Sequence, residues 1–199
     1  MAKKGVFICI EGLDGSGKTS QTKLLVRHLR RNGCDAVYTA EPTKGRIGRF
    51  IRRHCLNSEK RCSSMVETLL FAADRVEHIK TEIVPMLQAG RTVVSDRYVY
   101  SSYAYQGATG LDLEWIERAN QFAVRPDLAL FIDVKPELVL KRLKAKKSVM
   151  ENLETQRKVR QVYQTYVERG DLCRIDGGGS LAEVHGRLVK TIDDFLTKK

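Results

Sequence analysis

A glycine-rich segment near the start of the chain limits the possible folds more than any other feature of the sequence. Residues 12–19 read Gly-Leu-Asp-Gly-Ser-Gly-Lys-Thr and match the pattern G-x-x-x-x-G-K-[ST] completely. An apolar run, residues 6–10, comes before this segment, and apolar residues at helical spacing follow it. Glycines let successive backbone amides approach an anion closely, and the following helix adds its positive end. The sequence therefore predicts a phosphate-binding loop (P-loop) between a strand and a helix.

The residues of this loop have separate expected roles in binding ATP. Lys18 is expected to reach the β and γ phosphates, and Thr19 is expected to ligate Mg²⁺. Asp14 is unexpected here, because phosphates repel a carboxylate inside the loop. The candidate ATP-binding residues are Gly12, Leu13, Asp14, Gly15, Ser16, Gly17, Lys18 and Thr19.

Short apolar runs alternate with longer segments of helical period along the rest of the chain. The expected strands are 6–10, 36–39, 92–95, 128–133 and, more weakly, 172–175; the expected helices are 18–31, 48–56, 63–88, 112–122, 136–144, 151–169 and 180–196. This alternation predicts an α/β fold of three layers, the P-loop NTPase fold, with a five-stranded parallel sheet flanked by helices. We expect one domain, residues 1–199, with a mobile lid at about 144–156, the least hydrophobic stretch.

Composition narrows the functional classes. No apolar stretch reaches the roughly 18 to 20 residues that a membrane span needs, so we expect a cytoplasmic protein. The five cysteines are scattered without a C-x-x-C pair, which argues against a disulfide framework or a zinc site. The formal net charge is +11, but basic residues occur in several places and always near acids. This pattern favours a basic surface around a phosphate-binding cleft over dedicated nucleic-acid binding.

The residues after the third expected strand point to phosphoryl transfer. The chain contains no N-K-x-D tetrapeptide, which a switch GTPase uses to recognise guanine. Instead, this strand ends in Ser95-Asp96-Arg97-Tyr98. At the carboxyl end of a parallel strand, Asp96 faces the phosphate loop and can hold Mg²⁺ through water, while Arg97 can neutralise phosphate charge. The alternative for Asp96 and Arg97 is a surface ion pair.

Several further segments resemble the thymidylate kinase family. They are residues 8–19, Glu41-Pro42-Thr43, 69–75, Asp96-Arg97-Tyr98, 101–107 and 126–128. Their order and approximate spacing also fit, and the resemblance covers essentially the whole chain. It implies ATP-dependent phosphorylation of dTMP to dTDP in dTTP biosynthesis, by direct in-line transfer, with Mg²⁺ and in a homodimer.

The resemblance also implies roles for residues of the acceptor site. Phe71 stacks on the thymine base, and Arg75 donates to its 4-carbonyl; the two are four residues apart on an expected helix and share a face. Taken without the resemblance, the same residues favour core packing for Phe71 and a solvated ion pair for Arg75. Ser102 and Gln106 address the base edge. Tyr105 packs under the sugar and disfavours a 2′-hydroxyl, or is an ordinary buried tyrosine.

The remaining roles that the resemblance implies concern charge near the reacting phosphates. Asp14 accepts a hydrogen bond from the 3′-hydroxyl of the acceptor, and Arg97 clamps the acceptor phosphate. Either Arg46 or Arg52, close to the Glu41-Pro42 turn, assists Arg97.

The chain departs from the family in one respect. Relatives supply a further catalytic arginine from the phosphate loop or from the lid. Here the loop position is Gly15, and residues 144–156 contain lysines but no arginine. Arg142, just before the lid, or Arg157, just after it, is the expected substitute, unless this basic segment is only a solvated face. The candidate catalytic residues are Lys18, Arg97, Asp96, Asp14 and Arg142.

Two other functions stay open from the sequence. One is a kinase that accepts several deoxynucleoside monophosphates, because a base pocket can relax while the phosphate machinery persists. The other is a non-catalytic nucleotide-binding module whose basic surface binds nucleic acid.

Overall fold

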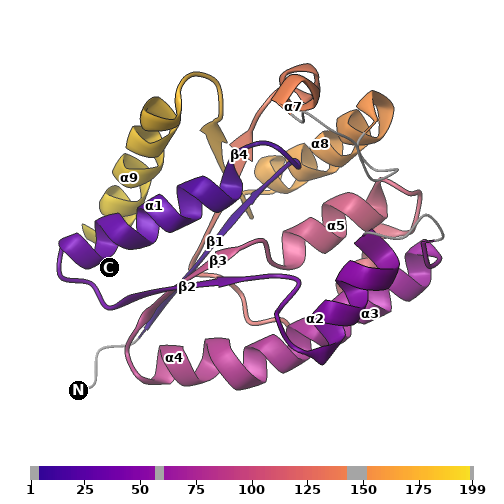
Figure 1. The fold of residues 1–199 in the computed structure, drawn as a ribbon, viewed down its shortest axis with the longest axis horizontal. Coiled ribbons are helices and arrows are strands. Elements are labelled where there is room, and N and C mark those ends of the chain that lie inside the picture. The colour runs from indigo at the N-terminus through magenta and orange to yellow at the C-terminus, as the bar shows by residue number, and fades with distance from the viewer. Residues whose placement is uncertain (1–4, 57–60, 143–151, 198–199) are drawn as a thin grey trace.

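Five parallel strands form the centre of the molecule. The computed structural model describes residues 5–56, 61–142 and 152–197 (Figure 1). The strands are β1 (Val6–Gly12), β2 (Ala36–Ala40), β3 (Thr92–Asp96), β4 (Leu128–Asp133) and β5 (Cys173–Asp176), in the order β2-β3-β1-β4-β5. The α/β fold with a five-stranded parallel sheet is confirmed, including the weakly predicted fifth strand. β1 is buried along its whole length, because strands pack on both its edges and helices cover both its faces.

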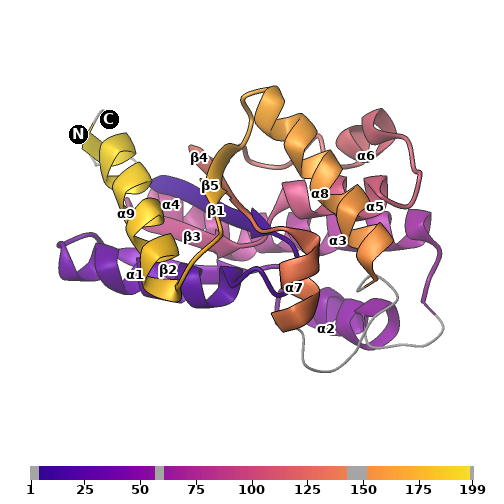
Figure 2. The same cartoon turned by 90° about the horizontal axis from the view of Figure 1, so that it is seen from above.

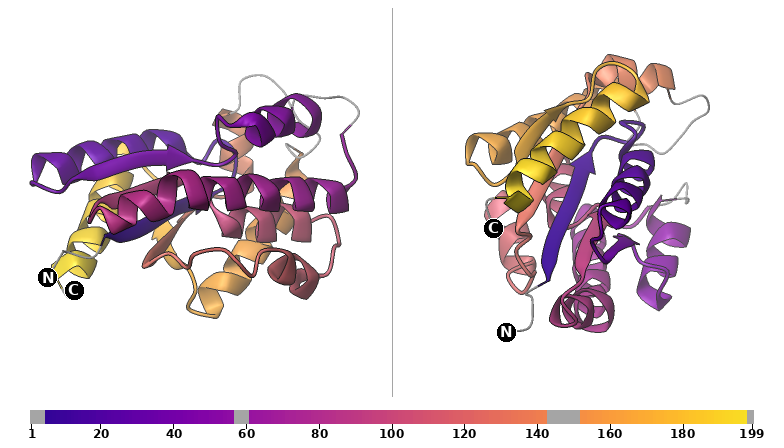
Figure 3. Two further views of the ribbon diagram at one scale, coloured as in Figure 1. Left: turned by 90° about the horizontal axis from the view of Figure 1, so that it is seen from below. Right: turned by 90° about the vertical axis from the view of Figure 1, so that its left-hand side faces the viewer.

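Helices cover both faces of this sheet (Figure 1, Figure 3). The helices are α1 (Lys18–Arg31), α2 (Arg46–Ile51), η1 (Arg52–Leu56), α3 (Ser64–His78), η2 (Ile79–Ile83), α4 (Val84–Gln88), α5 (Val99–Gly107), α6 (Leu113–Ala119), α7 (Pro136–Arg142), α8 (Leu153–Glu168) and α9 (Leu181–Thr197). Helices α1 and α9 pack together on one face, whereas α4, α5 and α8 pack on the other. On that second side, α5 contacts both α3 and α8 (Figure 2). None of the helices in the described part of the chain is long and apolar enough to cross a membrane.

The helices follow the sequence prediction with two differences. The long helix predicted for residues 63–88 is continuous but contains a π-helical turn, η2, and the one predicted for 48–56 ends in another, η1. Helix α5 was not predicted, because its aromatic and small residues give no amphipathic period; its buried positions include Val99, Tyr100 and Ala104. Residues 153–156, placed at the end of the predicted lid, form the first turn of α8, and 143–151 lie outside the described residues.

The order of the strands brings the loop and the Asp96-Arg97 pair together. β1 lies between β3 and β4, with Ile10 opposite Asp96 in the register. The amide of Arg97 donates to the carbonyl of Ile10 at 3.0 Å, which joins the two strand ends. In open parallel sheets, ligands bind at the carboxyl ends of the strands, where neighbouring connections leave in opposite directions. The site is therefore expected at this edge.

Candidate active site

The phosphate loop has the backbone conformation that its glycines allow. Gly17, directly before α1, has φ 92°, in the left-handed region that side chains rarely adopt. Gly12 has φ 153°, and a Cβ atom there would lie 2.8 Å from Ser16 Oγ and 2.9 Å from the carbonyl oxygen of Ile132. A side chain is therefore disfavoured at Gly12 by close packing and at Gly17 by the backbone conformation.

Lys18 is held inside the loop by a hydrogen bond to the loop backbone. It is buried, and its Nζ donates to the carbonyl of Leu13 at 2.7 Å. Burial, followed by the charge of Arg97, lowers the pKa of Lys18 to about 8, although the carboxylates of Asp14 and Asp96 act in the opposite direction. A phosphate bound here would supply the negative charge that the buried ammonium group lacks.

Thr19 and Asp96 form the other polar contact at the loop. Thr19 Oγ1 donates to Asp96 Oδ2 at 2.5 Å, and Tyr38 Oη donates to the same oxygen at 3.4 Å. Among the described residues, no three or more histidine, cysteine or acidic side chains gather as a metal site. A hydroxyl beside one carboxylate is nevertheless what Mg²⁺ uses when phosphate oxygens and water supply its other ligands. Thr19 and Asp96 therefore fit the ion that the sequence predicts.

Arg97 lies at the centre of the site in a conformation that is rare for its residue type. Its φ is 70°, and its side chain donates to Ser101 Oγ at 2.8 Å and forms an ion pair with Asp14. The guanidinium carbon lies 5.0 Å from the ring centre of Tyr105, whose hydroxyl accepts from the amide of Asp14 at 3.0 Å. The sequence predicted three separate roles for Arg97, Asp14 and Tyr105, and the structure brings them into direct contact.

The pKa values of this pair show how the charge is balanced. Burial would raise the pKa of Asp14, but the charges of Arg97 and Lys18 outweigh it and leave the pKa below its usual value. Burial alone would lower the pKa of Arg97, but Tyr105 and Asp14 raise it well above the usual value. The carboxylate inside the phosphate loop is therefore ionised and compensated.

Glu11 is a buried carboxylate for which the sequence predicted no role. It supports Arg97 indirectly, through Ser101. Glu11, at the end of β1, accepts from the amide of Tyr98 at 2.9 Å, from Ser101 Oγ at 2.6 Å and from Tyr163 Oη at 3.0 Å. Burial raises its pKa. Glu11 thus caps the start of α5 and holds Ser101, the partner of Arg97. The available signal was an acidic residue directly after an apolar strand.

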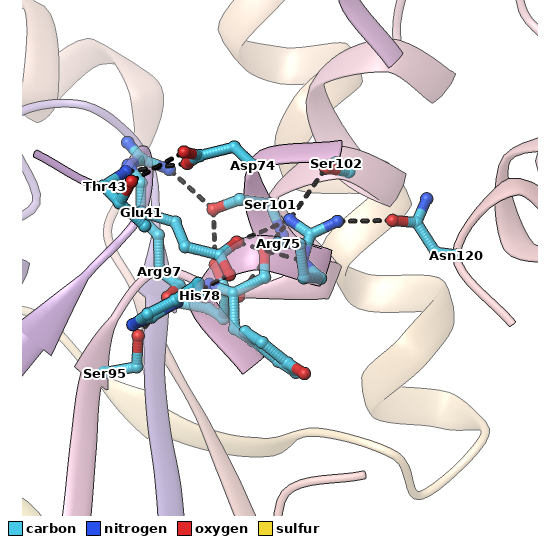
Figure 4. A network of polar contacts seen from close by, with 12 residues as sticks. Glu41, Thr43, Asp74, Arg75, His78, Ser95, Arg97, Ser101, Ser102 and Asn120 are labelled. Atoms are coloured by element: carbon cyan, nitrogen blue, oxygen red, sulfur yellow. Dashed lines mark hydrogen bonds and ion pairs between the residues drawn. The ribbon is translucent and has the colours of Figure 1, made fainter. Parts of the chain in front are cut away.

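Arg75, a predicted acceptor residue, lies in a network of polar contacts (Figure 4). Its Nε and Nη2 donate to Glu41 Oε2 at 3.0 and 2.7 Å, its Nη2 also donates to Ser102 Oγ at 3.1 Å, and its Nη1 donates to Asn120. The side chain is 1% exposed. The solvated ion pair that the residues alone suggested for Arg75 is therefore wrong: the pair exists but is buried.

The other predicted acceptor residues surround Arg75. Phe71 lies one turn before it on α3 and is partly buried. Ser102 and Gln106 are buried on α5, and Gln106 Oε1 has no hydrogen-bond partner within the described part of the chain. Two helices that contact each other, α3 and α5, thus carry an aromatic ring, a guanidinium group, a hydroxyl and an amide. Groups of these kinds suit a flat, polar ring attached to a phosphate.

Comparisons with known proteins agree with this geometry. A sequence model of the thymidylate kinase family matches residues 10–188. The chain belongs to the thymidylate kinase family. A protein of Pyrococcus abyssi, named "Probable thymidylate kinase", is 44% identical over 97% of this chain and 98% of its own length. "Thymidylate kinase" of Caldanaerobacter subterraneus is 38% identical over 97% of each chain. A "Probable thymidylate kinase" of Methanococcus vannielii is 47% identical over 81% of this chain and 78% of its own length.

Four arginines were predicted as alternatives for two roles in the site, and their surroundings differ. Arg52 donates to the carbonyls of Thr43, at 2.5 Å, and Pro42, so it supports the turn after β2. Arg46 is exposed and makes no hydrogen bond or ion pair with the described residues. Arg157 pairs with Glu137 at 2.7 Å on the surface. Arg142 is exposed at the end of α7, next to residues outside the described ranges.

The low pKa of Lys18 predicts how ATP binding by this protein depends on pH. ATP binds to the charged form of Lys18, so its affinity should be constant below about pH 8 and should weaken above it as the free protein loses this proton. The limiting slope is about tenfold in Kd per pH unit. Calorimetric titration with ATP in the absence of an acceptor measures this. Lys18→Met should bind more weakly and lose the slope, and a wild-type Kd that is constant to about pH 10 would contradict the prediction.

Proposed function

We propose that this protein transfers the γ-phosphoryl group of ATP to dTMP and releases ADP and dTDP, a step in dTTP biosynthesis. The observation that carries the proposal is the Arg97–Asp14 ion pair, which joins the ATP-binding loop directly to the acceptor side. A P-loop alone would fit many nucleotide-binding proteins. A P-loop that shares charged residues with a second pocket fits an enzyme that holds two nucleotides end to end.

On the donor side, the proposed roles follow from charge and hydrogen bonding. The amides of residues 12–17 and the start of α1 surround the β and γ phosphates, and Lys18 neutralises them. Thr19 and Asp96 hold Mg²⁺, which would supply further positive charge to the phosphates of ATP.

On the acceptor side, we assign the base to α3 and α5. Phe71 stacks on the thymine ring, Arg75 donates to its 4-carbonyl, and Ser102 and Gln106 meet its edge. Gln106 Oε1, which no described residue contacts by a hydrogen bond, is suited to accept from the N3–H of thymine. Tyr105 lies under the sugar.

The mechanism requires no covalent intermediate and no strong base, because the attacking phosphate oxygen of dTMP is already an anion. We propose that the entering phosphate displaces Asp14 from Arg97, which frees Asp14 to accept from the 3′-hydroxyl. As the acceptor oxygen bonds to Pγ, the bond from Pγ to the bridging oxygen breaks and its electrons leave with ADP. Arg97 and Lys18 stabilise the charge that spreads over the transferred group.

The acceptor is tested by comparing initial rates at fixed ATP for dTMP, dUMP, dCMP, dGMP and UMP. We expect the highest kcat/KM for dTMP, and a loss of about tenfold or more for UMP, because Tyr105 excludes a 2′-hydroxyl. Similar rates with several deoxynucleotides would replace the proposal by the broader kinase. Transfer to none of them, together with salt-dependent binding of DNA or RNA, would favour the nucleic-acid-binding module.

Arg142 is our proposed substitute for the missing lid arginine. It is exposed at the end of α7 and has no partner among the described residues, so it is available to a bound nucleotide. We expect Arg142→Ala to lower kcat by about tenfold or more while the KM values change little, because the charge acts mainly in the transition state. Arg125→Ala, which removes another exposed arginine from a surface ion pair, is the control. Equal kcat for the wild type and Arg142→Ala would remove Arg142 from the mechanism.

We also propose that the protein is a cytoplasmic homodimer whose subunits meet at the outer face of α3. The five cysteines are free thiols, which fits a reducing compartment. On α3, an apolar stripe is exposed on the side away from Arg75; its members are Met65, Val66, Leu69 and Val76. Apolar side chains at helical spacing on one exposed face are typical of an interface.

Sedimentation analysis tests the dimer. Leu69 is 52% exposed in the centre of the stripe, so Leu69→Glu should give a monomer at micromolar concentration. Leu181→Glu is the matched control, because Leu181 is equally exposed, at 54%, on α9. Dimers with Leu69→Glu would place the interface elsewhere, and a monomeric wild type would exclude it.

A further inference from the structure

Arg61, which lies just before α3, is an arginine without a role in the proposed function. Its Nε and Nη2 donate to the two carboxylate oxygens of Glu67 at 2.9 and 2.8 Å. Two parallel hydrogen bonds of this kind fix a guanidinium group in one orientation. Glu67 is itself buried in the first turn of α3, so the pair is firmly placed. The third nitrogen of Arg61, Nη1, is then held on the side of the group that faces away from Glu67.

This third nitrogen is buried but unpaired. Nη1 donates to no acceptor in the described part of the chain, although the whole side chain is only 14% exposed. An arginine keeps its proton in a protein, so the N–H groups of Nη1 are always donors. A buried donor on a charged group is unfavourable without an acceptor. Its chemistry selects an oxygen atom, and a negatively charged oxygen most strongly.

The spacing along α3 relates Arg61 to the acceptor. Glu67, Phe71 and Arg75 follow one another at intervals of four residues, so they share one face of the helix. Phe71 and Arg75 are the residues assigned to the thymine ring and its 4-carbonyl. The sugar is attached on the opposite side of that ring from the 4-carbonyl. The pair of Glu67 and Arg61 therefore lies at the end of this face where the sugar and phosphate of the acceptor are expected.

The charge of the phosphate loop reaches the same guanidinium group. The hydrogen bonds to Glu67 raise the pKa of Arg61 above its usual value, and the charge of Asp14 raises it further. Such an effect weakens with distance, so Asp14 and Arg61 are near each other. Asp14 is the residue that forms the ion pair with Arg97, the proposed clamp of the acceptor phosphate.

We propose that Arg61 is an acceptor-binding residue: Glu67 holds its guanidinium group, and Nη1 donates to a phosphate oxygen of dTMP, together with Arg97. This inference rests on the proposed function, because it takes dTMP as the acceptor. The hydrogen bonds to Glu67 already fix the long side chain of Arg61, so little conformational freedom is lost when the phosphate binds.

Comparing dTMP with thymidine, which lacks the phosphate, tests the contact. We expect Arg61→Ala to raise the Kd for dTMP about tenfold or more, whereas the Kd for thymidine stays within about twofold. Arg61→Lys keeps the positive charge but cannot hold Glu67 by two bonds and donate from a third nitrogen, so it should lose most of the same affinity. Calorimetric titration measures these constants without turnover. Wild-type affinity for dTMP in Arg61→Lys would show that charge alone acts, and would overturn the contact.

Glu67→Gln separates binding of the phosphate from a purely structural role. This variant keeps the guanidinium group and can still accept one of its hydrogen bonds, so the ratio of the two Kd values should stay within about threefold of the wild type. Arg91→Ala is the matched control, because Arg91 makes the same two-bond contact with Asp35 on the surface, at 2.8 Å for both bonds. It should leave the ratio unchanged. Equal weakening of dTMP and thymidine in Arg61→Ala and Glu67→Gln, with a lower Tm in both, would overturn the proposal.

Transfer to dTMP by the wild type tests the proposed function separately. A wild type that phosphorylates dTMP, together with an unchanged ratio in Arg61→Ala, would overturn this inference alone. If the wild type binds dTMP but transfers nothing, the proposed function fails, and the ratio in Arg61→Ala still decides whether Arg61 binds the phosphate.

Discussion

The ion pair between Arg97 and Asp14 is the interaction on which the site depends. Arg97 has a positive φ directly after β3, and hydrogen bonds to Ile10 and from Ser95 hold its backbone there. This conformation turns the side chain toward the phosphate loop. Asp14 is then tolerated among groups that bind anions, because the cation opposite lowers its pKa. One contact thus connects β1, β3 and α5, through Tyr105, at the point where two nucleotides would meet.

The sequence predicted the parts of this site that depend on local patterns. The loop at residues 12–19 and the five strands have short, recognisable signals, and the structure confirms the strands and the start of α1 at Lys18. Helix α5 has no such signal, because it is stabilised from outside. Its first amides donate to Glu11, which lies 87 residues earlier than Tyr98. A cap supplied by a distant strand is not visible in the sequence around the helix.

Arg75 shows a second reason why the sequence could not predict the whole site. Its spacing from Phe71 places both on one face of α3, and the sequence alone then suggested a solvated ion pair for Arg75. The partner is Glu41, 34 residues away, and the pair is buried beneath α5. Burial of an arginine depends on how many acceptors converge on it. The four acceptors here come from three separate segments of the chain: Glu41 after β2, Tyr98 and Ser102 at the start of α5, and Asn120 after α6. Such convergence follows from the tertiary fold.

The two buried glutamates, Glu11 and Glu41, lie at the same edge of the sheet. Three neighbouring strands, β2, β3 and β1, each end at or next to an acidic residue, namely Glu41, Asp96 and Glu11. Three carboxylates at one edge of a sheet repel each other unless cations lie between them. Arg75 compensates Glu41, which is also hydrogen-bonded to His78, while hydrogen bonds hold Glu11 and Lys18 lies near Asp96. The two outer carboxylates, Glu41 and Glu11, also hold helices α3 and α5, so the sheet edge orients both helices of the proposed acceptor site.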